Sequence, residues 1–280
     1  MLLPEIAEAL LLTTSLVSAS LIKLQTPPSP ATVYKDTSWI ETTWTRSNGD
    51  ILVNHWTNLN SGPSTPQPNQ QPTSSHLQTQ HPPPESLNTH PTNSPSPYLK
   101  SVFVKQVPES NFWIGITPFG NDTVFIAEAG KGSIYKITLS TGEYSIVLTD
   151  LTMKAATGSP ISEGVHGIVY HAGYLYYTST FGVGFYKVKI DPVTGKLDGK
   201  VIPITTVLGN PERLAVAGDG TSYVCDAGKN VIIKVDERGK VGNVTSAQRY
   251  SSVAFGRRGK DKNTFYILTN GRAVLSTTIS

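Results

Sequence analysis

A unit of about fifty residues recurs through the second half of the sequence, and it constrains the fold more than any other feature. Each unit reads as a polar turn, an apolar strand, a glycine turn and a second strand of alternating character. The turn residues Gly120, Gly173 and Gly220 are 53 and 47 residues apart, and Asn263 follows 43 residues later. This period, with about four strands per unit, is typical of propeller blades. We therefore predict an all-β propeller, since one blade cannot bury both faces of its sheet.

The composition agrees with many short strands and excludes several classes of binding partner and site. The chain has 24 Gly and 20 Pro, and only 15% of its residues are charged, which disfavours long helices and coiled coils. A net charge of +3 is too small to indicate nucleic acid. Cys225 is the single cysteine, so an internal disulfide and a cysteine zinc cluster are excluded. No apolar run reaches the roughly 18 residues of a membrane span.

A Pro/Ser/Thr/Gln-rich stretch over residues 59–99 interrupts the repeat. Its few aliphatic residues cannot bury enough apolar surface to offset the entropy of ordering, so we predict a disordered insertion. The step from Gly49 to Gly120 is 71 residues, too long for one unit and too short for two. We expect a six-bladed-type propeller with one blade incomplete or replaced by the insertion. Residues 26–58 would hold the first propeller strands and residues 100–280 the remaining blades.

The first 25 residues have two interpretations. An apolar run followed by Ser18-Ala19-Ser20 favours a signal peptide, whereas Glu5 and Glu8 with no basic residue before the run favour an N-terminal helix packed on the domain. We expect the secretory pathway, with the cytoplasm as the alternative. Two sequons, at Asn121 and Asn243, predict N-glycosylation.

Five segments resemble fungal propellers of the senescence-marker-protein/gluconolactonase/luciferin-regenerating-enzyme superfamily. They are Trp39-Ile40-Glu41 and the segments at 46–49, 164–168, 171–178 and 252–257. The subgroup that the chain most resembles is the hetero-Diels–Alderases of tropolone-sesquiterpenoid pathways. The resemblance implies six blades, of which the sequence shows about five. It also implies a closing strand beyond Gly271, for which few residues remain. A propeller without closure exposes a sheet edge, and the sequence leaves open whether this one closes.

In lactonases of this superfamily a divalent cation is held by Glu, Asn and Asp side chains at the starts of inner strands. The resemblance aligns those positions with four places in this sequence: Glu41, Ile114, His166 and Glu212, which is followed by Arg213. An isoleucine cannot bind a cation, and a guanidinium beside the last ligand repels one. We therefore predict no metal site and no cofactor. Ca²⁺ or another divalent cation belongs to the alternative, a metal-dependent lactone hydrolase.

The same positions predict a binding cup. His166, Arg213 and Glu41 are the candidate catalytic residues, and four aromatic residues are candidate substrate contacts: Trp39, Trp44, Trp113 and Tyr177. A cycloaddition requires a cavity that holds two reactants in near-attack geometry and one or two hydrogen-bond donors. The alternative for each aromatic residue is packing between blades. For His166 the alternative is a bond to a neighbouring blade, and for Glu41 a buried salt bridge with Arg213.

The function that the resemblance implies, together with the altered metal positions, is tailoring of a hydrophobic polyketide or terpenoid in a fungal secondary-metabolite pathway, as a metal-independent hetero-Diels–Alderase. A lactone hydrolase and a non-catalytic binding propeller or degenerate remnant remain as alternatives. Neither nucleic acid nor a membrane span is expected. Cys225 lies in an alternating strand and is expected to be a buried small hydrophobe. The sequence has no Gly-x-Ser-x-Gly elbow from which a serine-hydrolase triad could start.

Overall fold

The computed structural model describes residues 31–35, 39–45, 51–56, 107–110, 112–246, 250–256, 264–269 and 273–278. For the first three of these segments, and for residues 245, 246 and 273, it describes the backbone alone. The predicted signal peptide or helix at 1–25 and the insertion at 59–99 lie outside the described residues.

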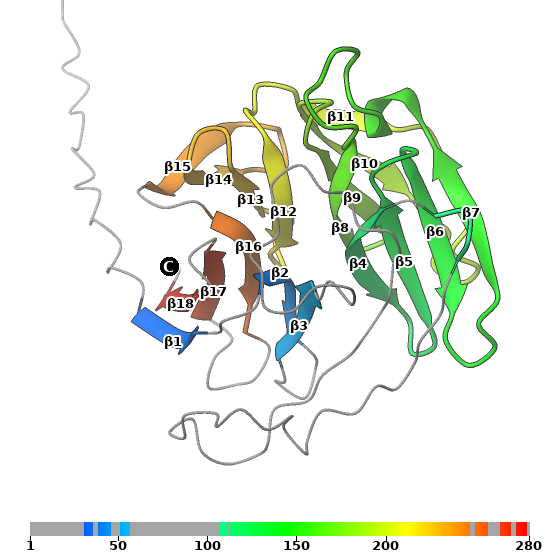
Figure 1. Cartoon of the computed structure of the whole chain (residues 1–280), viewed down its shortest axis with the longest axis horizontal. Helices are drawn as coiled ribbons and strands as arrows, with labels where there is room; N and C mark the ends of the chain where they lie inside the picture. The colour runs from blue at the N-terminus through cyan, green and yellow to red at the C-terminus, as the bar shows by residue number, and fades with distance from the viewer. Residues whose placement is uncertain are drawn as a thin grey trace, which may run out of the picture.

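The described strands form four four-stranded antiparallel sheets and one two-stranded sheet (Figure 1). Blade I comprises β4 (Trp113–Phe119), β5 (Thr123–Glu128), β6 (Ser133–Thr138) and β7 (Tyr144–Thr149). Blade II comprises β8 (Val165–His171), β9 (Tyr174–Ser179), β10 (Gly184–Lys189) and β11 (Ile202–Thr205). Blade III comprises β12 (Pro211–Val216), β13 (Ser222–Asp226), β14 (Val231–Val235) and β15 (Val241–Ser246). Blade IV comprises β16 (Tyr250–Phe255), β17 (Thr264–Thr269), β18 (Ala273–Thr278) and β1 (Ala31–Lys35).

The first strands of the sheets face one another around a centre. β4 contacts β8, β8 contacts β12, and β12 contacts β16. The ring continues through β2 (Trp39–Thr45), which contacts both β16 and β4 and pairs with β3 (Ile51–Trp56). In Figure 1 this pair lies in blue between β16 and β4. The all-β propeller is confirmed, and the two-stranded sheet agrees with an incomplete blade.

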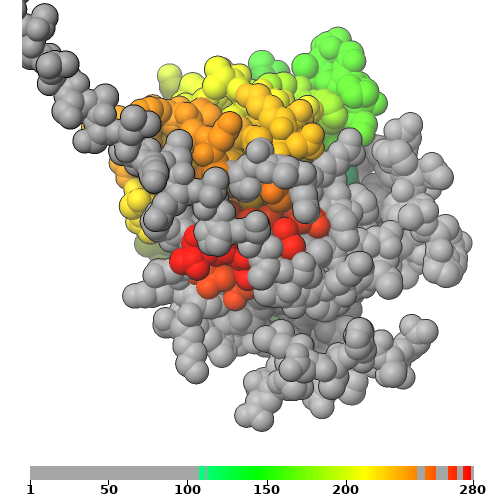
Figure 2. Space-filling model, turned by 90° about the vertical axis from the view of Figure 1, so that its left-hand side faces the viewer, coloured from blue at the N-terminus to red at the C-terminus, as the bar shows by residue number. Residues whose placement is uncertain are grey.

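The C-terminal sheet receives its outer strand from the N-terminal part of the chain. β1 pairs antiparallel with β18, with Ala31 opposite Ser276 and Lys35 opposite Ala273. An N-terminal strand therefore supplies the outer strand of blade IV and covers the unpaired N–H and C=O groups of β18. Figure 2 shows the C-terminal strands of blade IV in red next to blade III in yellow and orange, in agreement with the contacts of β16 with β12 and β13.

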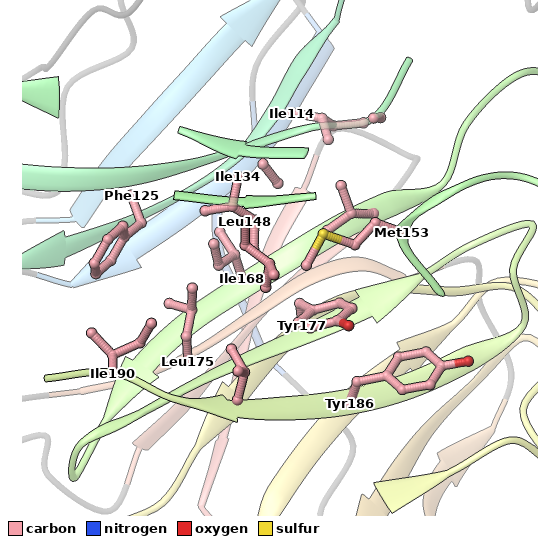
Figure 3. Close-up of a cluster of buried hydrophobic side chains, with 14 of the residues drawn as sticks. Ile114, Phe125, Ile134, Leu148, Met153, Ile168, Leu175, Tyr177, Tyr186 and Ile190 are labelled. Carbon is pink, nitrogen blue, oxygen red and sulfur yellow. The ribbon is translucent and has the colours of Figure 1, made fainter. Parts of the chain in front are cut away.

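The hydrophobic core is a set of layers between neighbouring blades. The layer between blades I and II, shown in Figure 3, contains the fully buried side chains of Phe125, Ile134 and Leu175. Similar layers lie between blades II and III and between blades III and IV. Each fully buried aliphatic or aromatic side chain contributes about 1.5–3 kcal/mol by leaving water. Cys225 is completely buried, as predicted, and burial raises the pKa of its thiol.

A candidate site at the centre of the ring

Each inner strand carries an irregularity near its start. The register with the second strand of the sheet shifts between Val165 and Ile168 in β8, and between Pro211 and Leu214 in β12. Bulges of this kind redirect side chains and are common beside active sites. The residues at the five shifts are Glu41, Ile114, the pair His166 and Gly167, the pair Glu212 and Arg213, and Ser251. The fold thus brings the sequence-predicted positions to equivalent places in the ring.

His166 is buried, with 3% of its surface exposed, and a carboxylate holds one side of its ring. Its Nε2 lies 3.0 Å from Oε1 of Glu163, in the loop that leads into β8. Its Nδ1 is also buried and has no hydrogen-bond partner in the described part of the chain. The ring is therefore oriented through one nitrogen, and the other nitrogen remains available to a ligand.

Glu163 is the residue that sequence reasoning missed. Burial raises the pKa of its carboxyl group, but the charge of His166, the hydrogen bond with it and the charge of Arg213 together lower the pKa below its ordinary value. Glu163 is therefore held as a carboxylate. The sequence signal was weak, because a single acidic residue three positions before a histidine in a loop has no periodic pattern.

Arg213 reaches this pair from the next blade. It is 4% exposed, and its Nη1 lies 3.1 Å from the point where a Cβ on Gly115 would stand. That same Cβ would lie 2.2 Å from the backbone oxygen of His166. The absence of a side chain at Gly115 therefore lets the starts of β4, β8 and β12 lie close together, with the Arg213 guanidinium near the backbone of His166.

The side chains of this set that the structure describes do not fit a divalent metal ion. Ile114 is buried in the hydrophobic layer between blades I and II. His166 has Nε2 on a carboxylate, and the positive charge of Arg213 acts on the same carboxylate. Within the described residues no group of three or more His, Cys, Asp or Glu side chains could hold a metal ion. Hard cations require several oxygen ligands and little neighbouring positive charge, which this donor set does not offer.

Two of the four candidate aromatic contacts lie in the core. Trp113 packs in a hydrophobic cluster with Val124 and with Tyr135, whose ring centroid is 6.0 Å away. Tyr177 is completely buried between blades I and II, where it stacks on Tyr186 at 5.3 Å (Figure 3). Its hydroxyl lies 2.6 Å from Thr152 Oγ1, and burial raises its pKa. Both residues therefore pack in the core between or within blades, which is the alternative interpretation given for the aromatic candidates.

The other two aromatic candidates, Trp39 and Trp44, are on β2. This strand lies between β16 and β4, and Trp39 is opposite Trp56 of β3. Their backbone therefore lies on the inner ring. Their side chains, like that of Glu41, lie outside the described residues.

A repeated clamp fixes the entry loops of blades I and III. Glu128, the last residue of β5, is completely buried and accepts hydrogen bonds from the N–H groups of Phe112 (2.8 Å) and Lys131 (2.6 Å). Asp226, the last residue of β13, accepts hydrogen bonds from Gly209 N–H at 2.6 Å and Asn210 N–H at 2.9 Å. Each carboxylate thus ties the loop before the inner strand to the end of the second strand.

The clamp has a signature in the sequence, an acidic residue followed by Ala-Gly-Lys. Glu128-Ala129-Gly130-Lys131 and Asp226-Ala227-Gly228-Lys229 occupy the same position in blades I and III. The two lysines donate through Nζ to the backbone oxygens of Glu109 and Val207 in the entry loops. Blade II has Ser179-Thr180-Phe181-Gly182 instead. Its entry loop, which carries Glu163, is therefore without the carboxylate and the lysine of its neighbours.

The two sequon asparagines are exposed. Asn121 is in the turn between β4 and β5, and Asn243 is on β15. Glycosylation at these positions stays a prediction. Among the described residues, no helix has the length and apolar character that a membrane crossing requires.

Comparisons with known proteins support the class of fold. No family model and no curated protein matches the chain. Among solved structures, a putative gluconolactonase is similar at 12% identity with a TM-score of 0.56, over 90% of this chain and 93% of that one. A catalytically inactive virginiamycin B lyase from Staphylococcus aureus, with quinupristin, is similar at 11% identity with a TM-score of 0.52, over 90% and 98%.

A third solved structure is similar over less of its length. It is the calcium-binding protein regucalcin from Agrobacterium tumefaciens, at 18% identity with a TM-score of 0.47, and this chain spans 62% of it. At these identities the comparisons establish the propeller fold alone. The chain is a β-propeller of the architecture seen in gluconolactonase-like and lyase structures.

Proposed function

We propose that this chain is a metal-independent enzyme that transforms a small molecule at the centre of its ring. The observation that supports the proposal is the buried His166, held by Glu163 at 3.0 Å, with Nδ1 available and the Arg213 guanidinium beside the pair. Buried groups that are already oriented stabilise charge developing on a substrate at little cost in reorganisation. The finer assignment is a tailoring enzyme of a fungal secondary-metabolite pathway, similar to the hetero-Diels–Alderases.

In that reaction an ortho-quinone methide and an alkene form one C–C and one C–O bond, and no proton is transferred. The enzyme has to align the two partners and lower the energy of the electron-poor one. In this candidate the His166 ring donates through Nδ1, and Arg213 provides a second donor, which is positively charged. Both would act on the oxygen of the quinone methide. Loss of one such donor lowers kcat by roughly 10²–10³.

The substrate would be a hydrophobic polyketide or terpenoid. Trp39 and Trp44, on the inner-ring strand β2, are the proposed aromatic wall, with Glu41 between them as a third polar group. Trp113 and Tyr177 would act from within the core by fixing the start of β4 and the second half of β9.

The same dyad supports a second candidate, proton transfer by His166. A carboxylate on one imidazole nitrogen is the arrangement that orients a histidine as a general base. Metal-independent opening of a lactone or an elimination would use it. The virginiamycin B lyase structure is of a variant inactivated by replacement of one histidine with alanine, so a propeller of this architecture does depend on a histidine.

The pH profile of kcat separates the two candidates. If His166 is a donor, it acts when protonated, and the rate falls as the pH rises and the ring loses its proton. If His166 is a base, the rate rises over the same range. We would assay a quinone methide with an alkene for the product ratio, and glucono-δ-lactone for hydrolysis, each with and without EDTA.

The expected result is an altered cycloadduct ratio, unaffected by EDTA and lost in His166→Gln and Arg213→Met. An unchanged product ratio contradicts the cycloaddition. Lactone hydrolysis that is abolished by EDTA and restored by Ca²⁺ contradicts metal independence. Ser179→Ala is the matched control, because Ser179 Oγ is buried in blade II and has no hydrogen-bond partner in the described part of the chain.

A further inference from the structure

One hydroxyl group lies between the two irregular strand starts that carry His166 and Arg213. Thr178, on β9, is completely buried and stands opposite the shift in β8, between Tyr177, which pairs with Ile168, and Ser179, which pairs with Val165. Its Oγ1 accepts a hydrogen bond from the N–H of Gly167, at 2.8 Å. The same Oγ1 donates to the backbone oxygen of Glu212 in blade III. The hydroxyl thus uses its donor and an acceptor site on two different blades.

The two bonded residues are the direct neighbours of the site residues. Gly167 follows His166, and Glu212 precedes Arg213. The approach is close, because a Cβ on Gly167 would lie 2.5 Å from the Glu212 oxygen and 2.9 Å from the Arg213 Cα. Because the two backbones are in close contact and both bind the Thr178 hydroxyl, a displacement of Thr178 would move both of them.

We propose that Thr178 is a positioning residue, whose hydroxyl fixes the imidazole of His166 relative to the guanidinium of Arg213. Thr178 acts through the two backbones and does not contact the substrate. The role in catalysis rests on the proposed function, whereas the coupling of the two blades through this hydroxyl is a property of the folded chain alone.

Blade II offers a matched control. Thr180 is also buried and also donates to blade III, at 2.9 Å to the backbone oxygen of Pro211. It lies two residues further along the chain, and its bond to Pro211 involves neither Gly167 nor Glu212. A general loosening of the contact between blades would follow from either threonine, whereas the coupling we propose belongs to Thr178.

The test is NMR of the full chain labelled with ¹⁵N, following the ring nitrogens of the six histidines. His166→Gln assigns the His166 signals. In Thr178→Val the His166 ring signals should shift more than those of any other histidine. They should stay at their wild-type positions in Thr178→Ser, which keeps the hydroxyl, and in Thr180→Val. The charged groups near His166 in the described chain, Glu163 and Arg213, are unchanged in all three variants.

In the activity assay Thr178→Val should lower kcat roughly ten- to a hundredfold with little change in KM, since a displacement of about 1 Å has effects of this size. A shift of the His166 signals without loss of activity would support the coupling of the two blades and contradict the role of Thr178 in catalysis, whereas a wild-type chain without activity would contradict the proposed function alone. Unshifted signals in Thr178→Val, or equal shifts in Thr180→Val, would overturn the inference. If Thr178→Val does not fold, amide exchange of wild-type Gly167 decides: slow exchange is expected, and fast exchange overturns the proposal.

Discussion

Blades I and III and blade II start in different ways, although all three have the same four-stranded plan. In blades I and III a buried carboxylate at the end of the second strand binds the N–H groups of the entry loop. In blade II the equivalent residue is Ser179, and the entry loop directs its own carboxylate, Glu163, toward the centre. The comparison shows that blade II lacks the stabilising clamp of its neighbours and that its entry loop instead carries a carboxylate bonded to the inner strand.

The largest effect is expected when the clamp is removed. Glu128→Ala leaves at least two N–H groups without their acceptor, and we expect a loss of about 3 kcal/mol in the free energy of unfolding, since each unsatisfied buried group costs about 1–3 kcal/mol. Ser179→Ala should change it by less than about 0.5 kcal/mol. Urea unfolding followed by circular dichroism measures both. Equal losses would break the comparison.

A somewhat smaller effect is expected in the entry loop of blade II. Gly164 follows Glu163, and a Cβ there would lie 1.8 Å from the backbone oxygen of Met153. Gly164→Ala should therefore destabilise the chain by about 2 kcal/mol, as overpacking typically does, and should reduce activity by moving Glu163 away from His166.

The control for this substitution is Gly218→Ala, where a Cβ would meet no atom within 4 Å. The measurement is the urea midpoint and the kcat of both variants, each compared with wild type. If Gly164→Ala retains full activity and stability, the loop is not the rigid support that the contact with Met153 implies.

The Glu163 carboxyl group should make the free energy of unfolding depend on pH in the acidic range. Its pKa is lowered in the folded chain, where burial opposes the lowering and His166 and Arg213 outweigh it. A lowered pKa contributes stability above the ordinary value of 4.5, and this contribution is lost as the pH falls through the folded value.

Thermal midpoints of wild type and Glu163→Gln should therefore differ at neutral pH and converge as the pH falls below the ordinary carboxyl range. A constant difference across this range would mean that Glu163 titrates in the folded chain as it does in the unfolded one.

The smallest effect is expected at the sequons. Asn121 and Asn243 are exposed, so glycans there would be accommodated without displacing the core. Secretion from a eukaryotic host should give a mass that falls after N-glycosidase treatment, with a thermal midpoint changed by little. Protein retained inside the cell, with an unchanged mass, would contradict the secretory route.

Much of the fold could be predicted because it depends on local chemistry. Polar turns such as the one at Gly173, which adopts a positive φ of 80°, mark the strand boundaries directly. The positions Ile114, His166 and Arg213 were found because the superfamily resemblance aligns them with the starts of inner strands. Glu163 was missed, since its role depends on where a loop places one carboxylate rather than on any pattern along the chain.

Other features depend on which segments meet in space. The pairing of β1 with β18 joins residues about 240 positions apart. A repeat pattern along the sequence indicates which strands are neighbours in one unit, but it does not indicate a pairing between the two ends of the chain. Whether Trp113 and Tyr177 face a funnel or a neighbouring blade also depends on blade packing, because alternation gives the two faces of a strand but not which face meets which blade.

The sequence by itself determined the strand repeat, the propeller class and the positions that open the inner strands, because turn residues and alternation act over a few residues. Only the tertiary structure decided the closure of blade IV, the burial of two candidate aromatic residues and the meeting of Glu163, His166 and Arg213. Those outcomes depend on contacts between blades, where side chains far apart in sequence compete for the same space.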